Sequence, residues 1–175
     1  MNDMEIRLAN SKDINNVIEF YKVLCEDPNN KALWKYGLYP TDEDLLNDIN
    51  NQTLYVLIDD DEIVSAGVIQ MKEDELYNDI NWTRHNPAVV HILATLPHRQ
   101  HKGYAKKLLM YLIELAKSNN RDSIHLDIVY DNDYARKLYE DVGFIKVEDK
   151  ELYYPDTGAI LSTLFEYKIM LPNNR

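Results

Sequence analysis

The chain of 175 residues has one cysteine, Cys25, so it can form neither an intrachain disulfide nor a metal cluster held by cysteines. It also lacks zinc-ligand spacing, and we expect no metal. No apolar run approaches the ~20 residues that a helix needs to cross a bilayer. The first residues, MNDMEIRLANSKD, lack the apolar stretch of a signal peptide. These absences predict a cytoplasmic protein that does not contact a membrane.

Basic residues are fewer than acidic ones: 19 Lys and Arg stand against 30 Asp and Glu, which gives a net charge of −11. Nucleic acid phosphates require a basic surface, so this balance argues against nucleic acid as a partner. The acidic balance can steer a cationic amine toward the protein, or it can serve solubility alone.

Apolar periodicity predicts a mixed α/β (α+β) layered domain. We expect strands at 4–9, 53–58, 62–70, 88–96, 123–128, 144–153 and 162–170, and helices at 13–24, 42–50, 104–118 and 132–142. The acidic turn 59–61 between two of the strands is expected to be a solvated hairpin. The chain shows no repeat, linker or low-complexity tract, so residues 1–175 are expected to form a single domain.

Residues 90–109, VHILATLPHRQHKGYAKKLL, are the most informative segment. They predict a buried strand, a tight loop and an amphipathic helix. The loop carries Q-x-x-G-x-A from Gln100 to Ala105. Backbone N–H groups at a helix N-terminus attract a diphosphate, and Gly103 lets the backbone approach it closely. Nearby cations add a local positive charge: His98, Arg99, His101, Lys102, Lys106 and Lys107.

A second motif, N-x-x-A-x-x-L-Y-x-x-x-G-F, runs from Asn132 to Phe144. Together the two motifs resemble those of the GNAT superfamily of N-acetyltransferases, and the similar order of elements extends over about residues 4–170. One departure is Thr95, which stands where the superfamily commonly has Val. The resemblance implies a mixed, mostly antiparallel central sheet, flanked by helices, whose two central parallel strands splay apart; here these are 88–96 and 123–128.

The resemblance also implies acetyl-CoA as co-substrate. Main-chain groups of Leu93 and Thr95 would pair with the pantetheine arm as an added strand does. Amides of the loop would hold the pyrophosphate. The expected cofactor-binding residues are Leu93, Ala94, Thr95, Gln100, His101, Lys102, Gly103, Tyr104, Ala105 and Asn132.

Tyr139 is the candidate general acid, because a phenol with a pKa near ~10 can protonate a departing thiolate whose thiol has a pKa near ~8.5. Its place in an apolar helical stripe is equally typical of packing. His91 is the candidate base for the amine proton, with an Asp or Glu acting through water as the alternative. His125 and Asp127 share one face of the next strand and are further candidates for base or relay.

The expected function is therefore transfer of an acetyl group from acetyl-CoA to a primary amine, by direct attack in a ternary complex. The acceptor, a small molecule or a peptide, stays open. Candidate acceptor-lining residues are Trp34, Tyr36, Tyr39 and Trp82. The alternatives are a catalytically silent acyl-CoA-binding sensor or interaction domain, and a transferase of a different acyl group. Edge strands near the C-terminus also leave a homodimer open.

Overall fold

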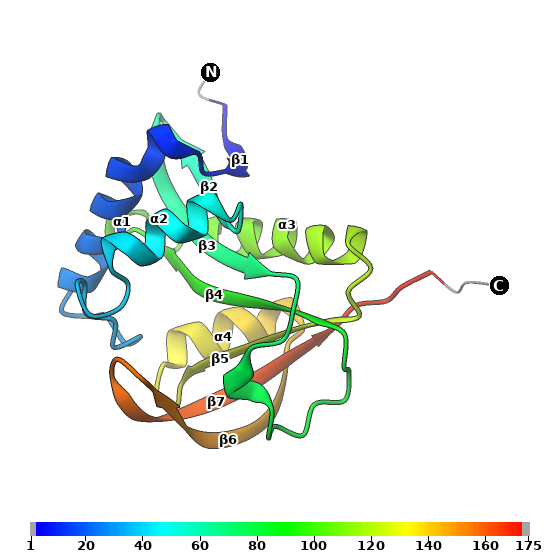
Figure 1. The fold of residues 1–175 in the computed structure, drawn as a ribbon. Helices are drawn as coiled ribbons and strands as arrows, with labels where there is room; N and C mark the ends of the chain where they lie inside the picture. Colours follow the sequence, from blue (N-terminus) through cyan, green and yellow to red (C-terminus); the bar gives the residue numbers. More distant parts are fainter. Residues whose placement is uncertain (1–2, 173–175) are drawn as a thin grey trace. The chain divides into compact units, whose positions relative to one another are not determined.

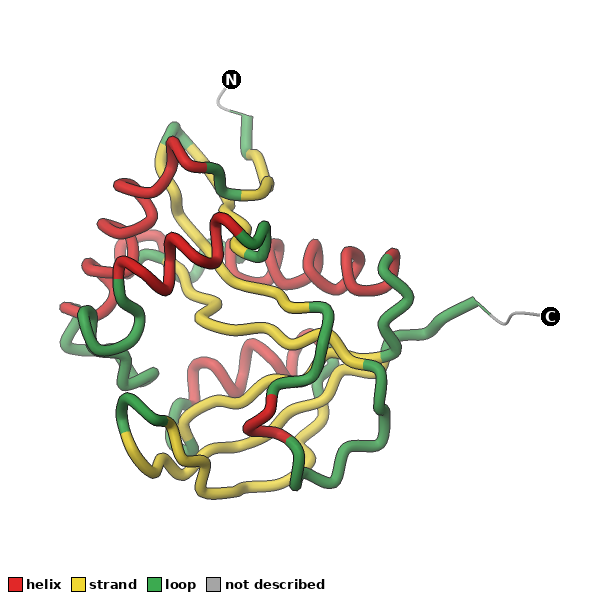
Figure 2. The backbone as a smooth tube through the Cα atoms, viewed as in Figure 1, coloured by secondary structure: helices red, strands yellow, loops and turns green. Residues whose placement is uncertain are grey.

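The computed structural model describes residues 3–172, which hold seven strands and four α-helices (Figures 1 and 2). The strands are β1 (Glu5–Leu8), β2 (Leu54–Asp59), β3 (Glu62–Gln70), β4 (Pro87–Thr95), β5 (Ser123–Val129), β6 (Ile145–Tyr154) and β7 (Gly158–Lys168). The helices are α1 (Ile14–Glu26), α2 (Asp42–Asn50), α3 (Tyr104–Ser118) and α4 (Asp133–Val142). Short 3₁₀ turns are η1 (Ser11–Asp13), η2 (Glu75–Tyr77) and η3 (Pro97–Arg99).

The strands form one hydrogen-bonded sheet in the order β1-β2-β3-β4-β5-β7-β6. Strand pairs β1–β2, β2–β3, β5–β7 and β6–β7 are antiparallel. Strands β4 and β5 run parallel, and their register joins Pro87 to Ser123 and Val89 to His125. The expectation of a mixed, mostly antiparallel sheet with a parallel pair is confirmed.

Contacts divide the chain into two compact units, and β4 and α3 each contribute to both. The first unit holds residues 1–69 and 91–109. In it α1 and α2 lie side by side (Figure 1). Apolar side chains at helical spacing, Val17, Phe20, Tyr21 and Leu24, bury one face of α1. Capping boxes at the starts of η1 and α2 supply partners for orphan N–H groups.

The second unit holds residues 70–90 and 110–175. Its helix α4 ends at Gly143, whose φ of 116° gives the left-handed C-cap that glycine adopts without a Cβ penalty. The segment 71–86, which is polar in sequence, contains η2 (Figure 2) and buries Tyr77 and Trp82 in a core with Leu152 and Leu164.

Element bounds differ from the expected ones mainly at ends. Strand β7 begins at Gly158 rather than at residue 162, because the long β6–β7 hairpin pairs as far as Tyr154 and Gly158. Among the described residues, no helix is long and apolar enough to cross a membrane.

Asp48 gives the first unit a measurable pH dependence. Burial raises the pKa of its carboxyl from the usual 3.8 to about 6, although a hydrogen bond from Thr53 lowers it in part. The folded protein therefore keeps this proton at pH values where the unfolded chain has lost it. The stability that the group contributes is full below about pH 4 and is lost as the pH rises through about 6.

Asp48→Asn removes this titration. The free energy of unfolding of the variant, relative to the unmodified protein, should therefore increase between pH 4 and pH 7. Urea unfolding across that range measures it. Parallel stability curves for the two proteins would show that burial does not raise this pKa.

Candidate active site

The connection from β4 to α3, in the first unit, is a tight loop. After η3, His101 and Gly103 adopt positive φ values of 65° and 81°. A Cβ added to Gly103 would meet open space, so its φ, rather than crowding, favours glycine there. Helix α3 then begins at Tyr104, and the N–H of Lys107 bonds to the carbonyl of Gly103 at 3.0 Å. The N–H groups of a helix's first turn have no partner within the helix, which suits an anion.

Side chains of α1 and β3 hydrogen-bond to carbonyl groups in the C-terminal half of β4. The Tyr21 hydroxyl donates to the Ile92 carbonyl at 2.9 Å, and the Ser65 hydroxyl donates to the Ala94 carbonyl at 2.7 Å. Ile92 itself has a φ of 45°, which is an outlier for a β-branched residue. Such local distortions are typical of functional sites.

Leu93 and Thr95 flank Ala94 on this part of the strand. Gly67 on β3 leaves the room that Leu93 occupies, because an added Cβ would lie 3.0 Å from Leu93 Cδ1. Thr95 is buried, and its hydroxyl donates to Ser65 Oγ at 3.3 Å. Two residues before Leu93, the candidate base His91 is half-buried.

Tyr139 lies on α4 in the second unit and is only 7% exposed. Its ring packs edge-on against Phe144 at 5.3 Å between centroids. Burial, and then the negative charge of Asp127, hold the pKa of the phenol well above its usual value. The side chain therefore packs and also keeps its proton, which a general acid requires.

Asn132 occupies the N-cap position of α4, and its Oδ1 accepts the N–H of Ala135 at 3.2 Å. On β5, Asp127 is half-buried. Its carboxylate accepts hydrogen bonds from the hydroxyls of Tyr77 and Tyr154. Both donors stabilise its ionised form. No periodic pattern in the sequence links these two tyrosines to Asp127, because they are 50 and 27 residues away from it.

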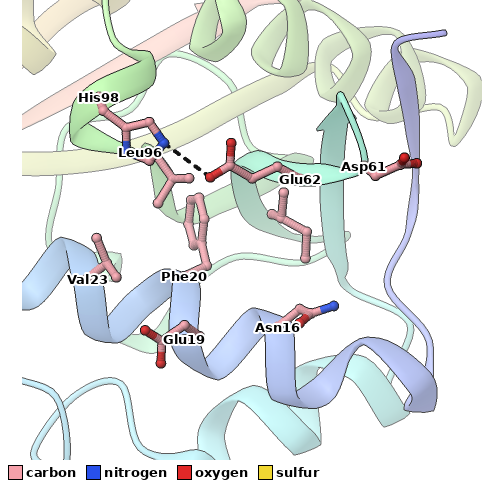
Figure 3. A pocket seen from close by; sticks show the side chains of 9 residues that line it. Asn16, Glu19, Phe20, Val23, Asp61, Glu62, Leu96 and His98 are labelled. Atoms are coloured by element: carbon pink, nitrogen blue, oxygen red, sulfur yellow. Dashed lines mark hydrogen bonds and ion pairs between the residues drawn. The ribbon is translucent and has the colours of Figure 1, made fainter. Parts of the chain in front are cut away.

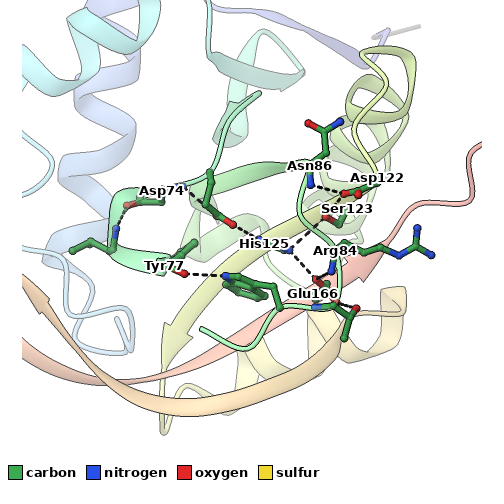
Figure 4. A network of polar contacts seen from close by, with 12 residues as sticks. Asp74, Tyr77, Arg84, Asn86, Asp122, Ser123, His125 and Glu166 are labelled. Carbon is green, nitrogen blue, oxygen red and sulfur yellow. Dashed lines mark hydrogen bonds and ion pairs between the residues drawn. The ribbon is translucent and has the colours of Figure 1, made fainter. Parts of the chain in front are cut away.

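His125, the other candidate on β5, is completely buried in a polar network (Figure 4). Its Nδ1 lies 2.8 Å from Glu73 Oε2, and its Nε2 lies 2.8 Å from Glu166 Oε2. The ring of Trp82 stacks on the imidazole of His125, with 3.7 Å between the ring centroids. Because each ring nitrogen lies against a carboxylate, His125 ties the segment 71–86 to the sheet.

Glu166 completes this network on β7. Burial alone would raise the pKa of its carboxyl, but hydrogen bonds from Thr83, from His125 and from the backbone of Arg84 outweigh burial and lower it. The carboxylate is therefore ionised and its oxygens are occupied.

The four candidate acceptor-lining residues do not form one group. Trp34, Tyr36 and Tyr39 lie between α1 and α2 and pack, partly buried, against the core of the first unit. The Tyr36 hydroxyl donates a hydrogen bond to Asp42 Oδ1 at 2.5 Å. The ammonium nitrogen of Lys22 lies over the Tyr36 ring, 5.4 Å from its centroid. Trp82 is buried in the network of His125 in the second unit.

Comparisons with known proteins agree with this architecture. The profile of the acetyltransferase (GNAT) family matches residues 17–144, which is more than two thirds of the chain. The chain is 32% identical over 111 residues to a ribosomal protein bS18-alanine N-acetyltransferase of Haemophilus ducreyi, covering 61% of this chain and 68% of that protein. It is 33% identical over 75 residues to the N-alpha-acetyltransferase RimI of Mycobacterium tuberculosis, covering 43% and 46%.

Solved structures show the same fold. A GNAT-family acetyltransferase from Streptococcus agalactiae superposes with a TM-score of 0.77 at 18% identity, covering 95% of this chain and 96% of that chain. The bS18-alanine N-acetyltransferase of Escherichia coli gives a TM-score of 0.69 at 17% identity, with 99% of each chain covered. The protein is thus an enzyme of the N-acyltransferase class. It belongs to the acetyltransferase (GNAT) family.

The buried network predicts a large stability difference between two substitutions. His125→Leu leaves the carboxylate of Glu166, which is 2% exposed, without its imidazole partner, and should lower the free energy of unfolding by about 3 kcal/mol. Glu73→Gln acts at a side chain that is 29% exposed and should cost no more than about 1 kcal/mol. Urea denaturation tests both. Equal losses would contradict the role given to the His125–Glu166 pair.

Proposed function

We propose that this protein transfers an acetyl group from acetyl-CoA to a primary amine by direct attack in a ternary complex, and that residues 1–175 act as a single GNAT domain. The observation that carries the proposal is the loop before α3. It combines positive φ values at His101 and Gly103 with the unpaired N–H groups expected of a helix start. Family membership adds acetyl-CoA as the group donor.

The cofactor would be held largely by the main chain. N–H groups from Gln100 to Ala105 would bind the pyrophosphate, with His101 and Lys102 adding positive charge nearby. Both of these side chains are exposed. Leu93, Ala94 and Thr95 would meet the pantetheine arm as a paired strand does. Asn132 would add a contact from the start of α4.

The reaction would proceed through a tetrahedral intermediate. The amine nitrogen attacks the carbonyl carbon of the thioester, and backbone donors of β4 stabilise the resulting oxyanion. The C–S bond then breaks, and the Tyr139 hydroxyl gives its proton to the sulfur. The base that takes the amine proton would be His91 or a carboxylate acting through water. Asp127, whose carboxylate accepts hydrogen bonds from Tyr77 and Tyr154, is the carboxylate candidate for this second role.

The acceptor would be the α-amino group of a peptide or protein. Two relatives carry names that specify such substrates, and one of the names specifies an N-terminal alanine. Trp34, Tyr36 and Tyr39 would line the acceptor, whereas Trp82 would contribute by packing on His125. We also predict that the protein is cytoplasmic and that it binds neither nucleic acid nor a membrane. The edge strand β6 would pair with its counterpart in a homodimer.

Release of free thiol from acetyl-CoA tests the proposal. A peptide that begins with alanine should support release and gain one acetyl group at its N-terminus, as mass spectrometry would show. The same peptide with a blocked N-terminus is the control. If acetyl-CoA raises the melting temperature but no amine supports release, the sensor alternative is favoured. If acetyl-CoA neither binds nor reacts, the cofactor assignment is wrong.

Tyr139→Phe separates the acid role from packing, because it removes only the hydroxyl. We expect kcat to fall about 10²-fold with little change in the KM for acetyl-CoA. Steady-state kinetics measure both. Tyr111→Phe, at an exposed position of α3, is the matched control and should leave kcat unchanged. An unchanged kcat for Tyr139→Phe would remove this residue as the acid.

A further inference from the structure

The acidic turn between β2 and β3 contacts the residues on both sides of the candidate pyrophosphate loop. Asp59 and Glu62 are paired directly across this hairpin, so their side chains share one face of it. The two residues between them, Asp60 and Asp61, both have positive φ, as a tight two-residue hairpin requires. The turn is therefore the expected solvated hairpin, with Asp60 and Asp61 exposed at its tip, and the carboxylates that flank the tip make specific contacts.

Glu62 binds the residues that precede the loop. Its Oε2 accepts a hydrogen bond from Arg99 Nε at 3.0 Å and lies 2.9 Å from Arg99 Nη2, while its Oε1 lies 3.1 Å from His98 Nε2 (Figure 3). Arg99 Nη1 also lies 3.9 Å from Asp60 Oδ2. A guanidinium with this double contact is fixed in direction as well as in charge.

Asp59 binds the residue that follows the loop. Its carboxylate accepts a hydrogen bond from the hydroxyl of Tyr104, the first residue of α3, and Tyr104 is itself buried. Residues 100–103 thus lie between two side chains, Arg99 and Tyr104, that the same hairpin end holds.

This arrangement is electrostatically unexpected. Carboxylates near a site for a polyanion oppose binding, and His98 and Arg99 already contact them. These two side chains are therefore already engaged by carboxylates. The compensating benefit is that contacts hold both ends of the loop, so that ordering it costs less when the cofactor binds.

We propose that Asp59 and Glu62 are positioning residues: by holding Tyr104 and Arg99 they fix the loop in the shape that presents its N–H groups to the pyrophosphate of acetyl-CoA. This inference rests on the proposed function. It deepens that function by assigning part of the cofactor affinity to residues that do not touch the cofactor.

The sign of a mutational effect tests the inference. Removing a negative charge near an anion site should strengthen CoA binding if charge alone matters. Loss of positioning should weaken it. We expect the double variant Asp59→Asn/Glu62→Gln to raise the Kd for CoA about tenfold, measured by calorimetry.

Asp61→Asn is the matched control. It removes one negative charge from the same turn. Asp61 makes none of these contacts in the described structure, and asparagine tolerates the positive φ there. Its Kd for CoA should stay the same or fall. If the double variant also keeps or lowers the Kd, the positioning role is wrong.

Further measurements separate positioning from general damage to the fold. In the double variant the KM for acetyl-CoA should rise while kcat and the KM for the acceptor peptide stay unchanged. Hydrogen exchange of the amides at 100–103 should become faster, with exchange in β6 and β7 unaltered. Faster exchange throughout, or a matched rise in both KM values, would contradict the positioning role.

A double-mutant cycle adds an independent check. Once Arg99→Gln has removed the partner, Glu62→Gln should no longer raise the Kd. Additive effects would contradict the inference. Failure of the proposed function looks different: the unmodified protein itself would not bind CoA, and both proposals would fall together.

Discussion

The first N–H groups of helix α3 have no partner within the helix, and holding them in a fixed curve is the constraint on which the rest of the candidate site depends. Positive φ at His101 and Gly103 shapes the loop before them. Hydrogen bonds from Tyr21 and Ser65 fix the strand that leads into it. The site is therefore mostly main chain, and its side chains act chiefly as supports.

Buried charge has a comparable supporting role in the second unit. His125 lies between Glu73 and Glu166, and Trp82 covers its ring. On the same strand, β5, the carboxylate of Asp127 accepts hydrogen bonds from the hydroxyls of Tyr77 and Tyr154. Each carboxylate has donors for its oxygens, which is how a protein keeps charge inside without a large penalty. This network explains why a segment that reads as a polar connection is ordered and packed.

Local patterns predicted the elements well because helices, strands and the two motifs depend on residues close in sequence. The strand–loop–helix around Gly103 and the helix that follows Asn132 are of this kind. The supporting contacts are not. Arg99 and Glu62 are 37 residues apart, Tyr77 and Asp127 are 50 apart, and His125 and Glu73 are 52 apart. Such pairs leave no periodic signal, so the contacts of the acidic turn with Arg99 and the carboxylates beside His125 could not be predicted.

The central claim is that backbone N–H groups at the start of α3 bind the pyrophosphate of acetyl-CoA. Backbone amide NMR during a titration with CoA tests it most directly. The account predicts that the signals of residues 100–105 shift most and saturate with CoA, and that pantetheine, which lacks the pyrophosphate, leaves them nearly unchanged. If CoA binds while these signals stay in place, or if pantetheine shifts them equally, the claim is contradicted.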